Sequence, residues 1–197
     1  CSGLVGSEMC IRDRSSLTDV GSLAPKLSEQ ARKREGLIGI HHSENRREDI
    51  EPLIELNPDF VVHMCHATDE DLLALNEANI SVVVCPRSND YFGNRPPLEK
   101  MIDLGLDLGF GTDNGMICSV NILDEIRFIK ENFPSIGLHK ILEIACFGLS
   151  DMFNKDGTSR YFNPKLSGWA LLSREAIDNY ESIFNPETKV LGARWRN

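Results

Sequence analysis

The chain has 197 residues, of which 41% are hydrophobic and 26% are charged, and its formal net charge is −9. These values are typical of one globular domain with enough apolar material for a sizeable core. The acidic balance excludes nucleic acid and anionic membranes as expected partners, because their phosphates would repel the chain. No apolar run approaches the ~18 residues that a membrane-spanning helix needs.

Six cysteines are scattered along the chain without a CxxC pair or a dense framework: Cys1, Cys10, Cys65, Cys85, Cys118 and Cys146. Most of them lie in or beside apolar runs, where a free cysteine behaves as a small hydrophobic residue. This usage favours a reducing, cytoplasmic location.

The first stretch, residues 1–14, has neither helical nor strand periodicity and lacks the basic start and apolar run of a signal peptide. It resembles a translated sequencing-adapter remnant. We therefore assign residues 1–15 to a non-native or disordered N-terminal remnant and expect the natural protein to begin well upstream.

From residue 26 onward, predicted helices and strands alternate. The predicted strands are short apolar runs, at residues 36–41, 60–65, 80–85 and 106–111. Predicted helices occupy residues 27–35, 45–56, 69–77 with Thr68 as N-cap, 97–104, 121–132 and 137–153, and a loop rich in Gly, Pro and Asn precedes the fourth of them.

This alternation predicts an α/β fold built from βα units, and the nearly continuous apolar strands indicate parallel pairing with both faces buried. Two arrangements remain open, half of an eight-unit barrel or an open doubly wound sheet. From about residue 156 the pattern changes to short runs between turn signals. Residues 167–172 and 189–193 are predicted strands of a small β appendage.

Polar residues gather where each predicted strand ends. These strand-end groups are His41 to Glu44, His63 with His66, Cys85 to Asn89, and Gly111 to Asn114. Each group alone has an ordinary interpretation, such as a hydrogen-bonded core histidine or a turn. In a barrel, however, the carboxyl ends of the strands form one rim, where active sites lie. The sequence therefore predicts that these residues converge on one cavity.

The residue types fit metal-assisted hydrolysis. Imidazole nitrogens and carboxylate oxygens are ligands for a divalent metal, and such a metal lowers the pKa of bound water to about 7. Hydrolysis of a C–N or C–Cl bond beside a ring nitrogen also needs a carboxyl group to move a proton and an electrophilic group to stabilise developing charge. His41, Glu44, His63 and Asp113 are the candidates.

The ordered series HxxE (His41, Glu44), HxxH (His63, His66), CPRSN (residues 85–89) and GTDN (residues 111–114) resembles the second half of the barrel in the amidohydrolase superfamily. The nearest branch is that of the deaminases and chlorohydrolases, and residues 96–114 are similar to archaeal chlorohydrolase-like members. The resemblance implies the C-terminal half of a TIM (β/α)8 barrel (about strands 5–8) over residues 16–155. Residues 156–197 would form the tail with a partial β appendage.

The resemblance also implies roles for the strand-end residues. His41 and Asp113 would bind the metal, and Asp113 would orient its water. Glu44 would move the proton and contact the substrate, and His63 would polarise the attacked group. Asn89 matches the family's loop asparagine and is assigned to substrate binding, while His66 would lie behind the metal ligands and His42 would be structural or line the substrate site.

The implied function is a metal-dependent hydrolase of carbon–nitrogen (non-peptide) or C–Cl bonds in a small heterocyclic substrate, with one divalent metal, zinc ahead of iron. The family also has an HxH metal pair on its first strand, and this chain has none. We therefore expect an incomplete, inactive fragment that binds metal poorly. Whether the full-length protein is a homo-oligomer stays open. Two alternatives remain: a non-enzymatic α/β module that binds a small ligand, and a two-metal hydrolase with a modified lysine upstream.

Overall fold

The computed structural model of the protein describes residues 12–14, 21–34, 36–149, 168–173 and 180–195. The chain divides into two compact units. Unit 1 comprises residues 1–84 and 93–108, and unit 2 comprises residues 85–92 and 109–197.

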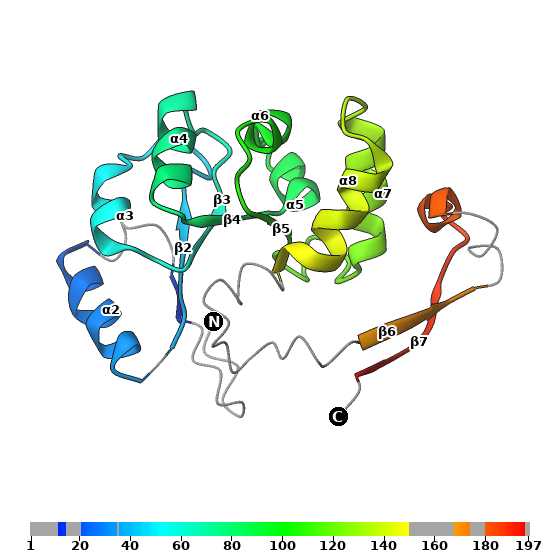
Figure 1. The fold of residues 1–197 in the computed structure, drawn as a ribbon, viewed down its shortest axis with the longest axis horizontal. Helices are drawn as coiled ribbons and strands as arrows, with labels where there is room; N and C mark the ends of the chain where they lie inside the picture. Colours follow the sequence, from blue (N-terminus) through cyan, green and yellow to red (C-terminus); the bar gives the residue numbers. More distant parts are fainter. Residues whose placement is uncertain (1–11, 15–20, 35, 150–167, 174–179, 196–197) are drawn as a thin grey trace. The chain divides into compact units, whose positions relative to one another are not determined.

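Unit 1 is built on parallel strands. These are β1 (Arg12–Arg14), β2 (Ile38–His42), β3 (Phe60–His63) and β4 (Ser81–Val84), which pair in parallel in this order (Figure 1). The strand β5 (Leu108–Phe110) follows β4 in the sheet order, and its first residue belongs to unit 1. The predicted α/β fold with a parallel sheet is confirmed.

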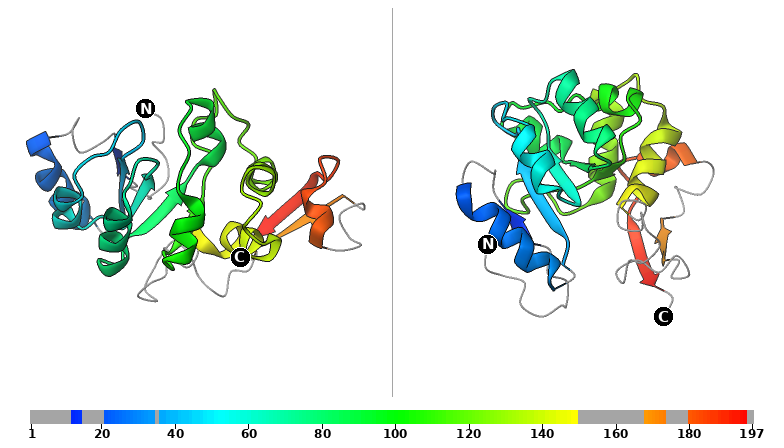
Figure 2. Two further views of the ribbon diagram at one scale, coloured as in Figure 1. Left: turned by 90° about the horizontal axis from the view of Figure 1, so that it is seen from above. Right: turned by 60° about the vertical axis from the view of Figure 1, so that its left-hand side comes forward.

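Four helices of unit 1 connect these strands: α2 (Ala24–Arg32), α3 (Glu51–Leu56), α4 (Asp69–Glu77) and α6 (Leu98–Asp103). Figure 1 and the right-hand view of Figure 2 show α2 alongside β2. All four residues of β3 are buried, and so are Leu53 of α3, Leu72 of α4 and Met101 of α6. Strands with both faces buried explain why their sequences are continuous apolar runs.

Thr68 caps the N-terminus of α4, as predicted. The Thr68 Oγ1 accepts a hydrogen bond from the Asp71 backbone N–H at 3.3 Å, and the Asp71 carboxylate accepts one from the Thr68 N–H at 2.9 Å. This reciprocal pair satisfies two N–H groups that the helix itself cannot satisfy. We expect Thr68→Ala to lower the free energy of unfolding by about 1 kcal/mol, measured by urea unfolding. Thr68→Ser keeps the oxygen and should retain most of that stability; equal losses in both variants would contradict the cap.

Gly39 in β2 lies opposite Phe60 of β3 in the sheet register. A Cβ at Gly39 would overlap the ring of Phe60, which is itself buried. Gly39→Ala is therefore expected to lower the free energy of unfolding by about 1–3 kcal/mol, because the ring must leave its packed position. Gly137→Ala is the matched control, since its new Cβ would meet nothing within 4 Å. Similar unfolding midpoints in urea for the two variants would refute the expectation.

Unit 2 contains the helices α5 (Pro86–Tyr91), α7 (Ile122–Asn132) and α8 (Leu138–Glu143). The helix α7 packs against α5, α8 and the 3₁₀ segment Tyr180–Phe184. The strands β6 (Gly168–Leu172) and β7 (Val190–Trp195) form an antiparallel pair, which confirms the two predicted tail strands.

Four predictions of local structure are wrong. Arg12–Arg14, expected to lack regular structure, forms a strand beside β2. The helix expected over residues 45–56 begins only at Glu51, and the loop expected before residue 97 contains α5. The helix expected over residues 137–153 ends at Glu143 and continues as a π-helical turn to Gly148, while residues 150–153 lie outside the described residues.

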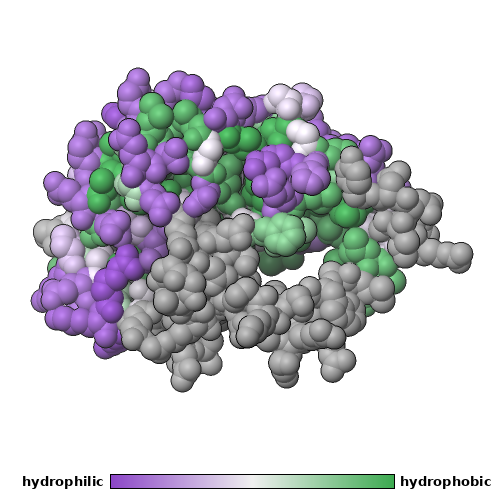
Figure 3. Space-filling view, viewed as in Figure 1, coloured by the Kyte–Doolittle hydropathy of each residue, from purple (hydrophilic) through white to green (hydrophobic). Residues whose placement is uncertain are grey.

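The described surface is mixed. On the face drawn in Figure 3, hydrophilic residues alternate with apolar ones. The large apolar side chains that are exposed include Tyr91, Met116 and Val120 of unit 2. Within the described ranges, no helix has both the length and the apolar character needed to span a bilayer.

Candidate functional site

Two adjacent parallel strands of unit 1 bring two histidines and a carboxylate together. His41 is the penultimate residue of β2, His63 is the last residue of β3, and Glu44 follows β2. The His63 Nε2 lies 3.1 Å from the His41 Nδ1 and 3.8 Å from the Glu44 Oε2. One possible metal-ligating atom from each residue lies within 4.8 Å of the other two. The predicted meeting of these three side chains at one edge of the sheet is therefore present.

The backbone at these strand ends is unusual. Ser43, His63 and Met64 have φ angles of 48°, 79° and 56°, in the left-handed region that favours glycine. Two hydrogen bonds hold this course of the chain: the Met64 N–H donates to the His42 carbonyl at 3.0 Å, and the His66 N–H donates to the Ser43 carbonyl at 2.9 Å. Strained residues of this kind cluster at functional sites, where the surrounding structure holds them in place.

The loop after β2 is fixed by its own polar side chains. The Ser43 N–H donates to the Glu48 carboxylate at 3.0 Å, and the Glu48 N–H donates to the Ser43 Oγ at 3.1 Å. Arg47 donates to both oxygens of Asp71 on α4, at 2.8 and 2.9 Å. These bonds compete with helix formation, which explains why α3 begins later than predicted. They also hold the segment that carries His41 and Glu44.

The side chains of His63 and Glu44 differ in their exposure to solvent. The His63 side chain is 1% exposed, whereas the Glu44 side chain is 27% exposed and can exchange protons with solvent. Burial, together with the charge of Glu44, raises the pKa of the nearby Cys65 thiol to about 12. Cys65 therefore stays a neutral thiol and is a poor metal ligand or nucleophile at neutral pH.

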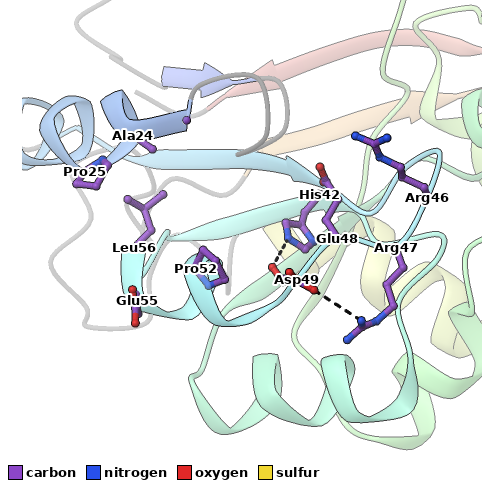
Figure 4. Close-up of a pocket in the computed structure, with 11 residues that line it drawn as sticks. Ala24, Pro25, His42, Arg46, Arg47, Glu48, Asp49, Pro52, Glu55 and Leu56 are labelled. Carbon is purple, nitrogen blue, oxygen red and sulfur yellow. Dashed lines mark hydrogen bonds and ion pairs between the residues drawn. The ribbon is translucent and has the colours of Figure 1, made fainter.

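A cavity of about 770 Å³ lies beside the loop after β2 (Figure 4). Its apolar wall comes from α2 and α3, with Ala24, Pro25, Pro52 and Leu56. Its polar lining comprises His42, Arg46, Arg47, Glu48, Asp49 and Glu55, and Gly21 completes the set. His41, Glu44 and His63 are not part of this lining, so the cavity is distinct from the cluster.

His42 faces this cavity rather than the cluster. Its ring nitrogens lie 3.0 Å from the Ser43 Oγ and 3.2 Å from the Asp49 carbonyl oxygen. Burial lowers the pKa of His42, although the charge of Glu48 opposes the effect. A neutral imidazole that bridges two loop groups agrees with the structural role predicted for His42.

His66 belongs to a chain of polar contacts among the loops of unit 1. The His66 Nε2 lies 3.0 Å from the Asn94 Oδ1, and the Asn94 Nδ2 donates to the Asn45 Oδ1 at 3.0 Å. These contacts tie together the loops that follow β2 and β3 and the loop before α6. Sequence reasoning missed Asn45 and Asn94, because a single Asn in a polar loop carries no distinctive signal.

The other two predicted site residues, Asn89 and Asp113, belong to unit 2. Asn89 is completely buried in α5. Asp113 has a φ of 53°, and its Oδ2 accepts a hydrogen bond of 2.5 Å from the buried Ser88 Oγ. The Arg87 N–H, in the same turn of α5, donates to the Glu125 carboxylate at 2.8 Å.

Sequence reasoning missed Ser88 and Glu125 as partners of this group. Ser88 lies inside the CPRSN motif, so the motif itself was the available signal. Glu125 is fully buried on α7, and burial raises its pKa to about 7. Its sequence context, two acidic residues in the first turn of an amphipathic helix, is indistinguishable from ordinary helix-terminal charge.

Comparison with known proteins supplies the family. A "Putative aminohydrolase" of Archaeoglobus fulgidus is 38% identical over 108 residues, 54% of this chain and 32% of that protein. A 5-methylthioadenosine/S-adenosylhomocysteine deaminase of Caldanaerobacter subterraneus subsp. tengcongensis is 32% identical over 132 residues, 55% of this chain and 30% of that protein. The chain thus spans about a third of the length of these relatives.

The fold is shared with solved enzymes as well. The structure of an atrazine chlorohydrolase from Arthrobacter aurescens, complexed with zinc, matches with a TM-score of 0.53 and 17% identity over 68% of this chain and 35% of that one. The model of the amidohydrolase family matches residues 26–156, most of the chain. The chain therefore belongs to the amidohydrolase family.

Proposed function

We propose that this chain is part of a metal-dependent hydrolase that cleaves a carbon–nitrogen bond of a small amino-substituted heterocycle, in the manner of a deaminase. The observation that carries the proposal is the cluster of His41, Glu44 and His63 at the ends of two adjacent parallel strands. Family membership supports it. The resemblance in the sequence implies a metal ligand, a proton carrier and a polarising group at these three residues.

The donor set of the cluster fits a divalent metal. Catalytic zinc is commonly held by three protein ligands, imidazole nitrogens and carboxylate oxygens among them, with a further position left for water. Unit 1 offers three such donors within mutual reach, two imidazoles and one carboxylate, of which the resemblance implies only His41 as a metal ligand. Iron accepts the same ligands, so the donor types do not distinguish the two metals. Zinc is preferred only because it is frequent in such sites. Asp113 stays a predicted metal ligand on the resemblance alone.

A metal bound here would supply water of lowered pKa as the nucleophile. Glu44 is suited to carry that water's proton to the departing amine, because its carboxylate is partly exposed and lies beside the cluster. His63 is suited to polarise the attacked ring, since its buried imidazole stands in a fixed orientation against His41. Asn89 is proposed to contact the substrate.

The substrate class follows from the relatives. The Caldanaerobacter relative deaminates 5-methylthioadenosine and S-adenosylhomocysteine, according to its name, so we propose an amino-substituted purine or a related ring for this chain. A chloro-substituted ring is the second candidate, supported only by the fold shared with atrazine chlorohydrolase. We propose further that residues 16–155 form the C-terminal half of a barrel and that residues 156–197 form its appended tail. A cytoplasmic location is part of the proposal, since Cys65, Cys85 and Cys118 are buried free thiols.

Zinc binding tests the proposal. The whole chain, freed of metal and titrated with zinc, is expected to bind about one zinc ion per chain with low affinity, because it lacks the HxH pair, and His41→Ala should weaken that affinity by about 100-fold or more, since one of few ligands is lost. His139→Ala is the matched control, because His139 is exposed on α8 and should leave the affinity unchanged. No bound zinc, or equal affinities in both variants, would refute the metal site and favour the non-enzymatic module.

A further inference from the structure

Unit 2 contains a buried carboxylate that the proposed function does not use. Glu125 lies in the first turn of α7, and its side chain is 0% exposed. Burying a carboxylate destabilises the folded state unless hydrogen bonds or ion pairs compensate for the lost hydration. Burial raises its pKa to about 7, in keeping with that cost. The partners of Glu125 therefore indicate what it contributes.

The first partner is the start of α5. The Glu125 Oε1 accepts a hydrogen bond from the Arg87 backbone N–H at 2.8 Å. Arg87 is in the first turn of α5, where N–H groups lack a partner within the helix, and the N-cap residue Cys85 supplies no side-chain bond. Glu125 thus provides from α7 the cap that the local sequence of α5 lacks, and its negative charge suits the positive end of a helix.

The Arg87 side chain strengthens the same junction. Its guanidinium donates to the Ser119 carbonyl at 3.3 Å and to the Ser119 Oγ at 3.2 Å, and it lies 3.8 Å from the Glu125 Oε2. Both the backbone and the side chain of Arg87 are therefore held by other segments of unit 2, which fixes the orientation of the first turn of α5.

That turn carries Ser88, the next residue. The Ser88 Oγ donates a hydrogen bond of 2.5 Å to the Asp113 Oδ2, and Ser88 is 1% exposed. Asp113 itself has the left-handed φ of 53°, a conformation that needs support from its surroundings. The direction of the Asp113 carboxylate thus depends on Ser88, and the place of Ser88 depends on the bond between Arg87 and Glu125.

We propose that Glu125 is a positioning residue, which fixes the first turn of α5 through the Arg87 N–H and, through Ser88, orients the Asp113 carboxylate. Its relevance to catalysis rests on the proposed function, in which Asp113 binds the metal. The positioning itself is a property of unit 2 and can be measured without metal.

The experiment uses four variants of the whole chain. Glu125→Met keeps the size of the side chain but removes the acceptor, while Glu125→Gln keeps an oxygen for the Arg87 N–H. Ser88→Ala removes only the last link. Glu131→Gln is the matched control, because Glu131 is exposed on the same helix.

Two readouts follow the two links by NMR: hydrogen exchange of the Arg87 amide, relative to the Phe133 amide at the end of α7, and the carboxyl ¹³C resonance of Asp113. In Glu125→Met the Arg87 amide should exchange about tenfold faster or more, the effect of one lost hydrogen bond, and the Asp113 resonance should move. Glu125→Gln should restore both readouts. Ser88→Ala should move the Asp113 resonance and leave the Arg87 amide protected.

An unchanged Arg87 amide or an unmoved Asp113 resonance in Glu125→Met would overturn the proposal, and so would equal changes in Glu131→Gln. Zinc affinity of the same variants then separates the two ideas. If Asp113 is a ligand, Ser88→Ala and Glu125→Met should weaken zinc binding by about 10–100-fold, as for other groups that orient ligands. Altered NMR readouts with unaltered zinc affinity would support the positioning role and contradict Asp113 as a ligand.

Discussion

In the full-length hydrolase that we propose, Glu44→Gln is expected to lower the rate of amine hydrolysis by about 10²–10⁴-fold, the usual contribution of a positioned acid–base group. The amide cannot take up or release the proton that the carboxylate would carry. The expectation depends on two features of Glu44: its Oε2 lies 3.8 Å from the His63 Nε2, and its side chain retains access to solvent. The measurement is the kcat for ammonia release from an amino-substituted heterocycle.

Glu51→Gln provides the matched control, since it replaces a carboxylate by an amide in the same way, at the exposed start of α3. Its kcat should stay within about threefold of the wild-type value, as expected for an exposed surface substitution that leaves the fold intact. A Glu44→Gln variant as fast as that control would show that Glu44 carries no proton in the rate-limiting step.

The stability of the chain is expected to fall as the pH rises from about 4.5 to 7, because of Glu125. Burial is the largest cause of the raised pKa of Glu125, from 4.5 to about 7, and the nearby Asp124 and Asp113 add to it, while Arg87 opposes it. Between these two values the folded chain retains a proton that the unfolded chain has lost. The stabilisation is therefore complete below pH 4.5 and disappears above pH 7, a change of about 3 kcal/mol.

Urea unfolding of the whole chain at pH 5 and at pH 8 measures this change. Glu125→Gln, which has no proton to lose in this range, should flatten the difference, and Glu131→Gln should not. Asp71 and Asp124, whose pKa values are lowered despite burial, by hydrogen bonds from Arg47 and from Ser119 respectively, destabilise the fold only at lower pH. A pH dependence that is the same in Glu125→Gln and the wild type would mean that Glu125 does not titrate as described.

The strands were predictable from the sequence because burial on both faces makes them continuous apolar runs, as in β3 and β4. The helix α4 was predictable to its first residue because Thr68 and Asp71 form a local cap. The start of α3 was not, because the bonds between Ser43 and Glu48 hold residues 45–50 in another conformation. The helix α5 was missed because its cap, Glu125, comes from a distant part of the sequence.

The same distinction applies to the site. The meeting of His41, Glu44 and His63 follows from a general rule, that parallel strands end at one edge, and so it could be inferred from residue order alone. The residues that orient site groups could not. Ser88 and Glu125 act through contacts between segments 25 and 38 residues apart, which leave no periodic or spacing signal in the sequence.

The central claim is that a divalent metal binds at His41, beside His63 in the cluster, and the ring ¹⁵N resonances of the five histidines test it most directly. Spectra of the whole chain with and without zinc should show large shifts for His41 and His63. His42, His66 and His139 should keep their positions, since none of them belongs to the cluster. Shifts confined to these three would place the metal away from the cluster, and no shift at all would mean that no histidine binds zinc; either result would contradict the claim.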